Sequence, residues 1–469
     1  MPKHSTLAVV LVAAGLLSPT SAGAELAPPP NAVAPSDIVV ARGRPPVPVA
    51  LLVSTAGEAV LAVTAAAPGA SWGEAGRESA VVSVEVDGRY ASDLVVTGPR
   101  RTPRGLALGT LTAGRHTLAF RFAADRSAPR TTLARLTGLR LTVAEAGTRA
   151  EVVRRHAPVL AGRALTGPFE NARTDTPLLA WHEDAPGPAP GQRRLVYSTV
   201  WSNEDGGTVG PALMARWGRT TDIEWVYAVV VDAGGHRVPG TAVYQGPDHR
   251  TLPFAGTYSG DHPVLQACTS NNTLCDAVDG TMLFALPADD TRPPRRAREY
   301  LMDTHPWTYR VMAEEVLREG RVEQPSDPAT PELGDQRTYL YLEVDKDTGP
   351  ATAPGEAPGA AVVVHLRGDP RTYRSDHGTP SWSVARDDPA ATTVELPAGT
   401  RAVDVERIDV VRVPLAAADS GATVTVTDLN RAFLLDAAWR PRPSFAEAHG
   451  LAVRLDANAP VATIWGSAA

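Results

Sequence analysis

Acidic and imidazole side chains gather in the middle of the chain, where they could bind a cation. Asp222 and Glu224 are two positions apart in an apolar run, and alternate residues of a strand point to the same face. Two carboxylates on one face repel unless a cation, an arginine or a proton offsets their charge. Calcium or magnesium, which take oxygen ligands, would suit such a site. The expected ligands of a mixed carboxylate and histidine site are Asp222, Glu224, Asp205, His182 and His262.

Two other interpretations of these carboxylates stay open. Arg216 and Arg219 are close in sequence and could pair with the carboxylates as structural ion pairs. Alternatively, Asp222, Glu224 or Asp205 could be the acid and base of a hydrolase acting on polysaccharide or phosphoester bonds. A catalytic pair would lie in an open cleft, with one carboxyl group in an apolar setting and a raised pKa. The sequence contains no G-x-S-x-G, H-E-x-x-H, phosphate-loop or dinucleotide motif, which weakens the enzyme hypothesis.

Tryptophans lie close to the acidic segment. Trp201, Trp217 and Trp225 could form a platform on which sugar rings stack. Packing in the core is the alternative role for all three, because large aromatic rings are common in protein interiors.

The two cysteines, Cys268 and Cys275, are seven positions apart. In an exported protein this spacing predicts a disulfide that closes a small loop. Such a loop contributes stability of about 2 kcal/mol.

The N-terminus has the pattern of a secretory signal peptide. A short basic start is followed by the apolar run 7–17 and by A-G-A at 22–24, so cleavage is expected before Glu25. The run is shorter than the roughly 20 residues of a membrane span. We therefore expect a secreted protein without a membrane span. Its net charge of -7 argues against nucleic acid as a partner.

Alternation of apolar and polar residues predicts a mainly β, multidomain fold of antiparallel β-sandwiches. Ala80, Val82 and Val84 form one such pattern, and 340–344 forms another. One notable helix is expected near 306–319, with Asp303 or Thr304 as its cap. The predicted organisation is a signal peptide (1–24), a Pro-rich linker (25–36), an N-terminal β-sandwich (37–147), a central β-rich domain with the helix (151–323) and a C-terminal β domain (335–469).

The central domain resembles the secreted Vps62-like and necrosis-inducing-protein-like sandwiches. The resemblance is carried by 156–160 (H-A-P-V-L), 175–178 (D-T-P-L), 222–226 (D-I-E-W-V) and 260–264 (G-D-H-P-V). In the necrosis-inducing group such residues line a divalent-cation site, which the resemblance implies here. The family's histidine-rich heptad is missing, with Arg219, Thr220 and Thr221 in its place, which argues against toxin activity.

The N-terminal domain resembles carbohydrate-binding-like jelly rolls, through V-E-V-D-G at 84–88 and G-R-H-T-L at 114–118. The leading hypothesis is a secreted or cell-surface-associated binding protein for an extracellular glycan or cell-envelope polymer, with a divalent cation in the central domain. A secreted hydrolase and a structural envelope protein without a site are the alternatives.

Overall fold

The computed structural model describes residues 31–164, 167–204, 207–327 and 329–467. The predicted signal peptide and Asp205 lie outside these residues. Residues 31–469 form one compact unit, so the three predicted domains are called here the first, central and third blocks. Whether each block folds alone stays a prediction. The mainly β fold class is confirmed, since six sheets account for the strands of the described residues.

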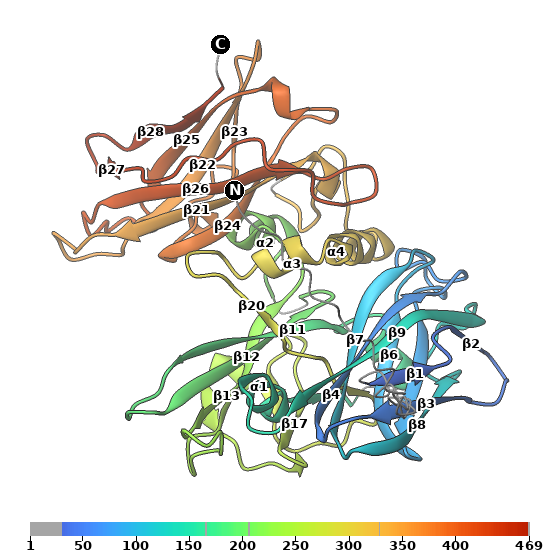
Figure 1. Cartoon of the computed structure of the whole chain (residues 1–469). Coiled ribbons are helices and arrows are strands. Elements are labelled where there is room, and N and C mark those ends of the chain that lie inside the picture. Colours follow the sequence, from blue (N-terminus) through green and yellow to red (C-terminus); the bar gives the residue numbers. More distant parts are fainter. Residues whose placement is uncertain (1–30, 165–166, 205–206, 328, 468–469) are drawn as a thin grey trace, which may run out of the picture. The chain divides into compact units, whose positions relative to one another are not determined.

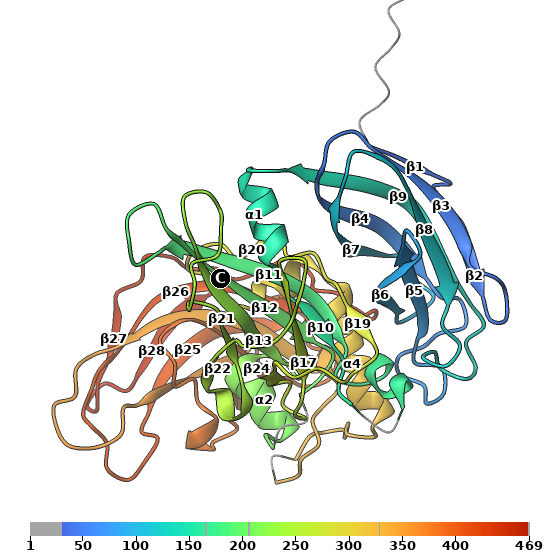
Figure 2. The same ribbon diagram turned by 90° about the horizontal axis from the view of Figure 1, so that it is seen from below.

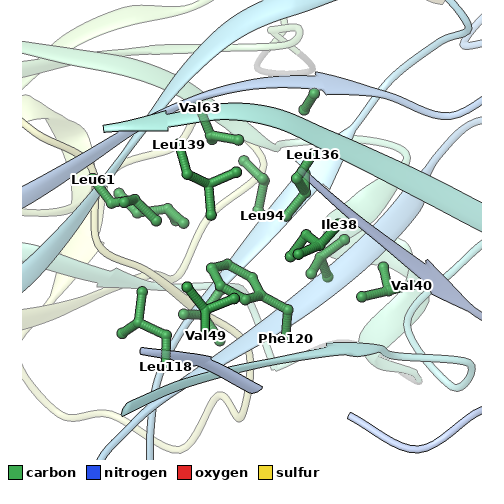
Figure 3. Close-up of a cluster of buried hydrophobic side chains, with 14 of the residues drawn as sticks. Ile38, Val40, Val49, Leu61, Val63, Leu94, Leu118, Phe120, Leu136 and Leu139 are labelled. Atoms are coloured by element: carbon green, nitrogen blue, oxygen red, sulfur yellow. The ribbon is translucent and has the colours of Figure 1, made fainter. Parts of the chain in front are cut away.

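The first block is a sandwich of two antiparallel sheets, in the strand orders β1-β3-β8-β5-β6 and β2-β9-β4-β7. The predicted inward residues Ala80, Val82 and Val84 are fully buried between them, in the core drawn in Figure 3. The end of the predicted linker pairs as β1 with β3. The strands are β1 (Ala32–Ala34), β2 (Ile38–Ala41), β3 (Val47–Val53), β4 (Gly57–Ala66), β5 (Ala80–Val86), β6 (Arg89–Val96), β7 (Thr102–Leu111), β8 (Gly114–Phe122) and β9 (Leu133–Glu145).

The opposite face of β5 and β6 is also buried. Val81 and Val95 are at most 2% exposed and share an apolar cluster with Tyr197 and Phe284 of the central block. The indole Nε1 of Trp72 donates to Glu315 Oε2 at 2.9 Å, which links the same two blocks. The first and central blocks therefore share a core.

The central block has two mixed sheets, in the orders β15-β14-β13-β12-β11-β20 and β16-β17-β10-β19, with β18 paired to β17. Two pairings, β10–β17 and β11–β20, are parallel, so the block departs from the expected antiparallel pattern. The strands are β10 (Val159–Ala161), β11 (Pro177–Pro186), β12 (Arg193–Trp201), β13 (Ile223–Val231), β14 (Val243–Gln245), β15 (Thr251–Pro253), β16 (Tyr258–Ser259), β17 (His262–Ala267), β18 (Leu274–Cys275), β19 (Leu283–Phe284) and β20 (Asp290–Thr291).

The predicted helix is α4, but its expected caps are wrong. Pro306 stands at the N-cap and makes no side-chain cap, while Asp303 and Thr304 belong to the short α3. Three further helices, α1, α2 and α3, were not expected because none has more than eight residues. The helices are α1 (Arg149–His156), α2 (Gly210–Trp217), α3 (Tyr300–Thr304) and α4 (Trp307–Arg318), all labelled in Figure 1. The 3-10 turns of this block are η1 (Pro168–Ala172) and η2 (Pro247–His249).

The third block is a second sandwich of two antiparallel sheets, in the orders β24-β21-β26-β27 and β23-β22-β25-β28. Its core contains Leu340, Leu342 and Val344, as their alternation predicts. The strands are β21 (Tyr339–Thr348), β22 (Gly359–Leu366), β23 (Thr372–Arg374), β24 (Asp388–Glu395), β25 (Val405–Val413), β26 (Val424–Leu434), β27 (Val453–Leu455) and β28 (Val461–Gly466), with 3-10 turns η3 (Gln336–Thr338), η4 (Pro380–Trp382) and η5 (Ala402–Asp404), and most of the strands are labelled in Figure 2.

Buried ion pairs connect the third block to the segment that leads into α3. Arg296 Nε lies 2.8 Å from Glu343 Oε1 on β21, whose carboxylate is fully buried. Arg431 on β26 pairs with Asp303, and its Nε is 3.5 Å from Glu343 Oε2. Each of these charges depends on its partners, because a buried charge without a counter-charge is costly.

Replacement of Glu343 by Gln should therefore lower the free energy of unfolding by roughly 3 kcal/mol, since the buried Arg431 and the partly buried Arg296 lose their shared carboxylate. Chemical denaturation measures this effect. Asp347→Asn, at an exposed position of the same strand, is the matched control and should change stability by less than about 0.5 kcal/mol. Equal effects of the two substitutions would contradict the assigned role of Glu343.

Candidate functional site

A cluster of polar side chains surrounds the junction of β12 and β13. The backbone N–H of Trp201 donates to Asp222 O at 2.9 Å, and that of Glu204 donates to Thr220 O at 3.0 Å. These bonds hold the loop after β12 beside the start of β13. The cluster, called here the acidic centre, consists of Glu204, Asp222, Glu224, Gln245, His249, Asn271 and Asn272.

Asp222 is the most buried carboxylate of the acidic centre, with an exposed fraction of 2%. Its Oδ2 accepts a hydrogen bond of 3.1 Å from Asn272 Nδ2. Burial raises the pKa of Asp222 well above its usual range, and the charges of Glu224 and Glu204 raise it further. Burial and Glu224 also raise the pKa of Glu204. The three carboxylates are therefore close enough to repel one another, as predicted for Asp222 and Glu224.

Glu224 is more accessible and belongs to a chain of hydrogen bonds. Gln245 Nε2 donates to Glu224 Oε2 at 2.8 Å and lies 2.6 Å from His249 Nδ1. The half-exposed His249 ring is also 3.6 Å from Glu224 Oε1, and its Nε2 is 2.9 Å from Asn271 Nδ2. This chain runs from a partly buried carboxylate to a ring at the protein surface.

The proposed arginine partners of these carboxylates lie elsewhere. Arg219 is buried and pairs with Glu299 at 2.9 Å, while the Arg216 guanidinium lies 4.1 Å from the centroid of the Trp217 ring. Within the described residues, neither arginine makes an ion pair of 4 Å or less with Asp222 or Glu224. The interpretation as direct ion pairs is therefore wrong, although the charge of Arg219 still lowers the pKa of Asp222.

Two amide oxygens of the acidic centre are buried without a hydrogen-bond donor in the described part of the chain. They are Gln245 Oε1 and Asn272 Oδ1, on residues that are 3% and 0% exposed. Buried amide oxygens are normally satisfied, and amide and carboxylate oxygens are the ligands that hard cations take. The donor chemistry therefore fits calcium or magnesium. No group of three or more His, Cys, Asp or Glu side chains among the described residues has a metal-binding arrangement, so amide oxygens would have to complete the ligand set.

Three backbone positions of this region have left-handed φ angles at residues other than glycine. They are Asp248 (φ 57°), His249 (φ 55°) and Asn272 (φ 49°). Such conformations are uncommon and cluster at functional sites.

The two histidines of the predicted ligand set contact other groups. His182 lies opposite Tyr197 on β12, four positions from Trp201, which is about 13 Å along a strand; its Nδ1 is 2.7 Å from Ala288 O. His262 Nε2 lies 3.3 Å from Glu58 Oε2 of the first block. Neither histidine is therefore in contact with the acidic centre. Asp222 and Glu224 stay a prediction as metal ligands, and so does Asp205, which lies outside the described residues.

The predicted tryptophan platform does not form as a unit. Trp201 is fully buried in the core of the central block, so its ring has no face for a sugar and that assignment is wrong. Trp217 ends α2 and Trp225 lies on β13, and both are half-buried. Their role in ligand binding stays a prediction.

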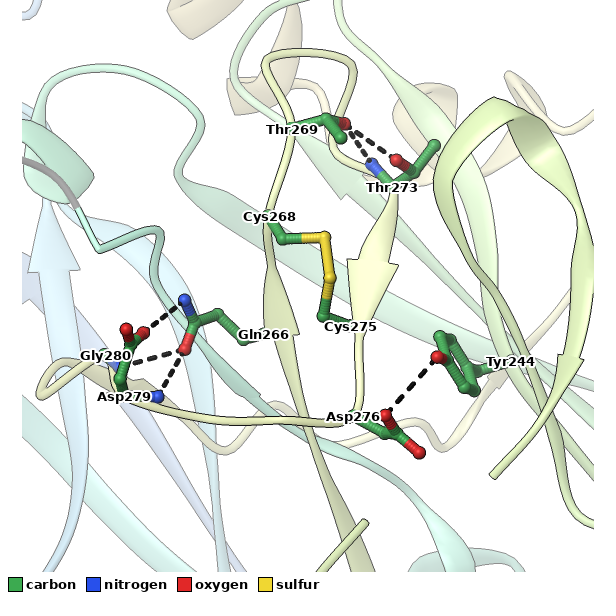
Figure 4. The surroundings of a disulfide bond; sticks show 9 residues. All are labelled: Tyr244, Gln266, Cys268, Thr269, Thr273, Cys275, Asp276, Asp279 and Gly280. Atoms are coloured by element: carbon green, nitrogen blue, oxygen red, sulfur yellow. Dashed lines mark hydrogen bonds between the residues drawn. A yellow bond between two sulfur atoms is a disulfide. The ribbon is translucent and has the colours of Figure 1, made fainter. Parts of the chain in front are cut away.

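The predicted disulfide between Cys268 and Cys275 is confirmed, with a Cα–Cα distance of 5.9 Å. Figure 4 shows that Thr273 bonds back to Thr269 through its backbone N–H and its hydroxyl group, which closes the loop. The loop carries Asn271 and Asn272, so the disulfide positions two members of the acidic centre.

Glu204, Gln245 and Asn272 were not predicted as site residues because their partners come from distant segments.

Comparisons with known proteins give no family. No protein-family model matches the chain, and no curated protein matches it. Similar solved structures include the C-terminal domain of EclA, a sugar-binding protein (18% identity, 23% of this chain, 64% of that chain, TM-score 0.15). Another is a family two carbohydrate esterase from Clostridium thermocellum in complex with cellohexaose (14% identity, 28% of this chain, 34% of that chain, TM-score 0.15). A third is a β-glucosidase from Paenibacillus barengoltzii (12% identity, 21% of this chain, 10% of that chain, TM-score 0.14).

In each case the matched region spans less than two thirds of the other protein. At these TM-scores the similarities carry no argument about function. The resemblance to Vps62-like and necrosis-inducing-protein-like sandwiches stays a prediction. In the described residues, no helix is long and apolar enough to cross a membrane.

Removal of the disulfide should loosen the loop that holds Asn272. The double variant Cys268→Ser, Cys275→Ser should lose about 2 kcal/mol of unfolding free energy, measured by denaturation. Since the chain has only these two cysteines, dithiothreitol should destabilise the wild type by the same amount. Dithiothreitol should not change the stability of the variant. If it destabilised the variant, the assignment of its effect to the disulfide would be contradicted.

The Glu58–His262 pair should make stability depend on pH. Burial alone would lower the pKa of His262, but the hydrogen bond to Glu58 and its charge have the larger combined effect, so this pKa is raised. Burial alone would raise the pKa of Glu58, but the interactions with His262 and Thr110 have the larger combined effect, so this pKa is lowered. The stability from His262 is lost as the pH rises through its folded-state pKa, and that from Glu58 as the pH falls through its own. The pair therefore stabilises the folded state most between pH 4.5 and pH 6.5, the ordinary pKa values of the two groups.

Glu58→Gln should lower the unfolding free energy by about 2 kcal/mol near pH 5.5, and the deficit should shrink toward pH 9. Denaturation curves at several pH values measure it. Glu145→Gln, at an exposed position of β9, serves as the control and should give no pH-dependent difference. A deficit for Glu58→Gln that grows with pH would contradict the pairing.

Proposed function

We propose that this chain is an exported glycan-binding protein whose acidic centre holds a divalent cation, calcium or magnesium. The observation that carries the proposal is the combination of three mutually repelling carboxylates with two buried amide oxygens that lack a donor. Both features are unfavourable in the protein alone and favourable with a cation. Export rests on the N-terminal sequence pattern.

The energetic argument concerns the charge of Asp222. A carboxylate that is 2% exposed and lies near two others is costly to ionise. A bound cation would offset the three charges and give Gln245 Oε1 and Asn272 Oδ1 a partner. Asp222 and Glu224 would hold the ion with these amide oxygens, and the ion would supply positive charge and coordination sites for hydroxyl groups.

The rim of the acidic centre offers groups suited to a sugar ligand. His249 is half-exposed, and its ring nitrogens lie 2.6 Å from Gln245 Nε2 and 2.9 Å from Asn271 Nδ2. Imidazole and amide groups can donate to and accept from sugar hydroxyls. His249 has a left-handed backbone, with φ 55°, and its Nδ1 lies 3.6 Å from Glu224 Oε1.

The hydrolase alternative is supported by the raised pKa of Asp222, which would keep a general acid protonated. However, Asp222 is 2% exposed and its carboxylate is covered by Asn272. A general acid must come within hydrogen-bond reach of its substrate. Burial of Asp222 therefore favours a ligand for a cation over an acid catalyst.

The proposal predicts bound metal in the purified chain. Elemental mass spectrometry should find about one calcium or magnesium per molecule, and Asp222→Asn, Glu224→Gln should reduce the content at least tenfold. Asp232→Asn, Asp261→Asn changes two exposed carboxylates of the same block and should keep the metal. Glycan-array binding should disappear with EDTA and return with calcium or magnesium. A wild-type chain without metal would contradict the cation, and array binding insensitive to EDTA would contradict its role.

A further inference from the structure

A second polar site lies far from β12 and β13 in the sequence. The loop between β6 and β7, the first turn of α4 and the segment 438–440 line a cleft of about 190 Å³. Its charged residues are four arginines, Arg100, Arg101, Arg310 and Arg440, and one carboxylate, Glu314. We call this the arginine cleft. It has three positive charges in excess, although the whole chain has a net charge of -7.

The positive charge of the arginine cleft is only partly neutralised within the protein. Arg310 Nε pairs with Glu314 at 2.7 Å, and Arg440 pairs with Asp436 at 2.7 Å while its side chain stays 62% exposed. Arg100 and Arg101 are exposed, and among the described residues neither makes an ion pair of 4 Å or less. The charge of Arg100 is nevertheless close enough to lower the pKa of Glu314, which burial raises.

The first turn of α4 adds to this positive potential. The helix has twelve residues, no side-chain cap and no acidic residue in its first turn, where Arg310 lies instead. A cation at the N-terminal end of a helix is unfavourable because the macrodipole is positive there. An oxyanion in the cleft would offset both the arginines and the helix end.

The surroundings of Trp307 leave room for an anion that is carried on a larger molecule. The Arg104 guanidinium lies over its ring, 4.1 Å from the centroid, and its indole Nε1 is buried without an acceptor in the described residues. Trp307 also lines a neighbouring cleft of about 440 Å³ that contains Arg104 and His305. The arginine cleft alone is smaller than the roughly 300–1,000 Å³ of sites for drug-sized ligands. A ligand could therefore place one acidic group among the arginines and continue past the indole.

We propose that the arginine cleft binds the carboxylate of an acidic glycan, with the adjoining sugar residues along Trp307. Guanidinium groups match carboxylates through paired hydrogen bonds, and the edge of an aromatic ring suits contact with a sugar ring. The site is separate from the acidic centre, and its occupancy does not require a cation there.

The test uses the full mature chain with EDTA present, so that failure of the metal proposal does not affect it. Isothermal titration with a galacturonate oligomer should give binding that weakens as salt rises, and a neutral cello-oligomer of equal length should bind at least tenfold more weakly. Arg100→Ala, Arg101→Ala should weaken binding of the acidic oligomer at least tenfold. Both residues are exposed on a loop, so the fold should be unaffected.

Arg115→Ala, Arg121→Ala is the matched control. It removes two exposed arginines of β8 from the same block, with the same change in net charge, and it should leave the affinity within about twofold. No binding of the acidic oligomer, or equal losses in the two variants, would overturn the proposal. Equally tight binding of a single-stranded DNA of similar charge would also overturn it, because the cleft would then recognise charge without the sugar.

Discussion

Pairing of buried charges is the constraint on which this structure depends. Arg219 with Glu299, Arg296 with Glu343, and Arg431 with Asp303 are ion pairs whose members lie largely out of solvent. All three involve the segment between β20 and α4, which contacts both the central and the third block. Because an unpaired buried charge costs several kcal/mol, this segment has few alternative positions. The two blocks are thereby held by specific polar contacts as well as by apolar packing.

The acidic centre departs from this rule, which is why it is the best candidate for a site. Elsewhere an arginine accompanies most buried carboxylates, whereas Asp222 has Asn272 as its hydrogen-bond partner and two carboxylates as neighbours. The disulfide loop, the η2 turn and two strands all contribute to holding these groups together. Carboxylates that repel one another and are held in place by the fold are suited to binding a positive ion.

The arginine cleft is the electrostatic counterpart of the acidic centre. In the acidic centre Asp222 has no arginine within ion-pair distance among the described residues, and in the arginine cleft Arg100 and Arg101 have no such carboxylate. The two sites lie on different elements and would recognise different groups of a ligand. A glycan that carries both hydroxyl and carboxylate groups could engage either site, which unifies the two proposals without making one depend on the other.

The sequence by itself determined the local features: the sandwich strands of 80–86 and 340–344, the body of α4, the disulfide and the proximity of Asp222 to Glu224. These features follow from the periodicity of apolar side chains in strands and helices and from short spacings along the chain. Tertiary structure alone decided which distant residues meet. His262 pairs with Glu58, and Arg219 pairs with Glu299, because packing of sheets brings together residues that no sequence pattern relates. Burial of Trp201 and of the outer face of β5 likewise depends on which block covers them, and that is set by contacts between segments far apart in the chain.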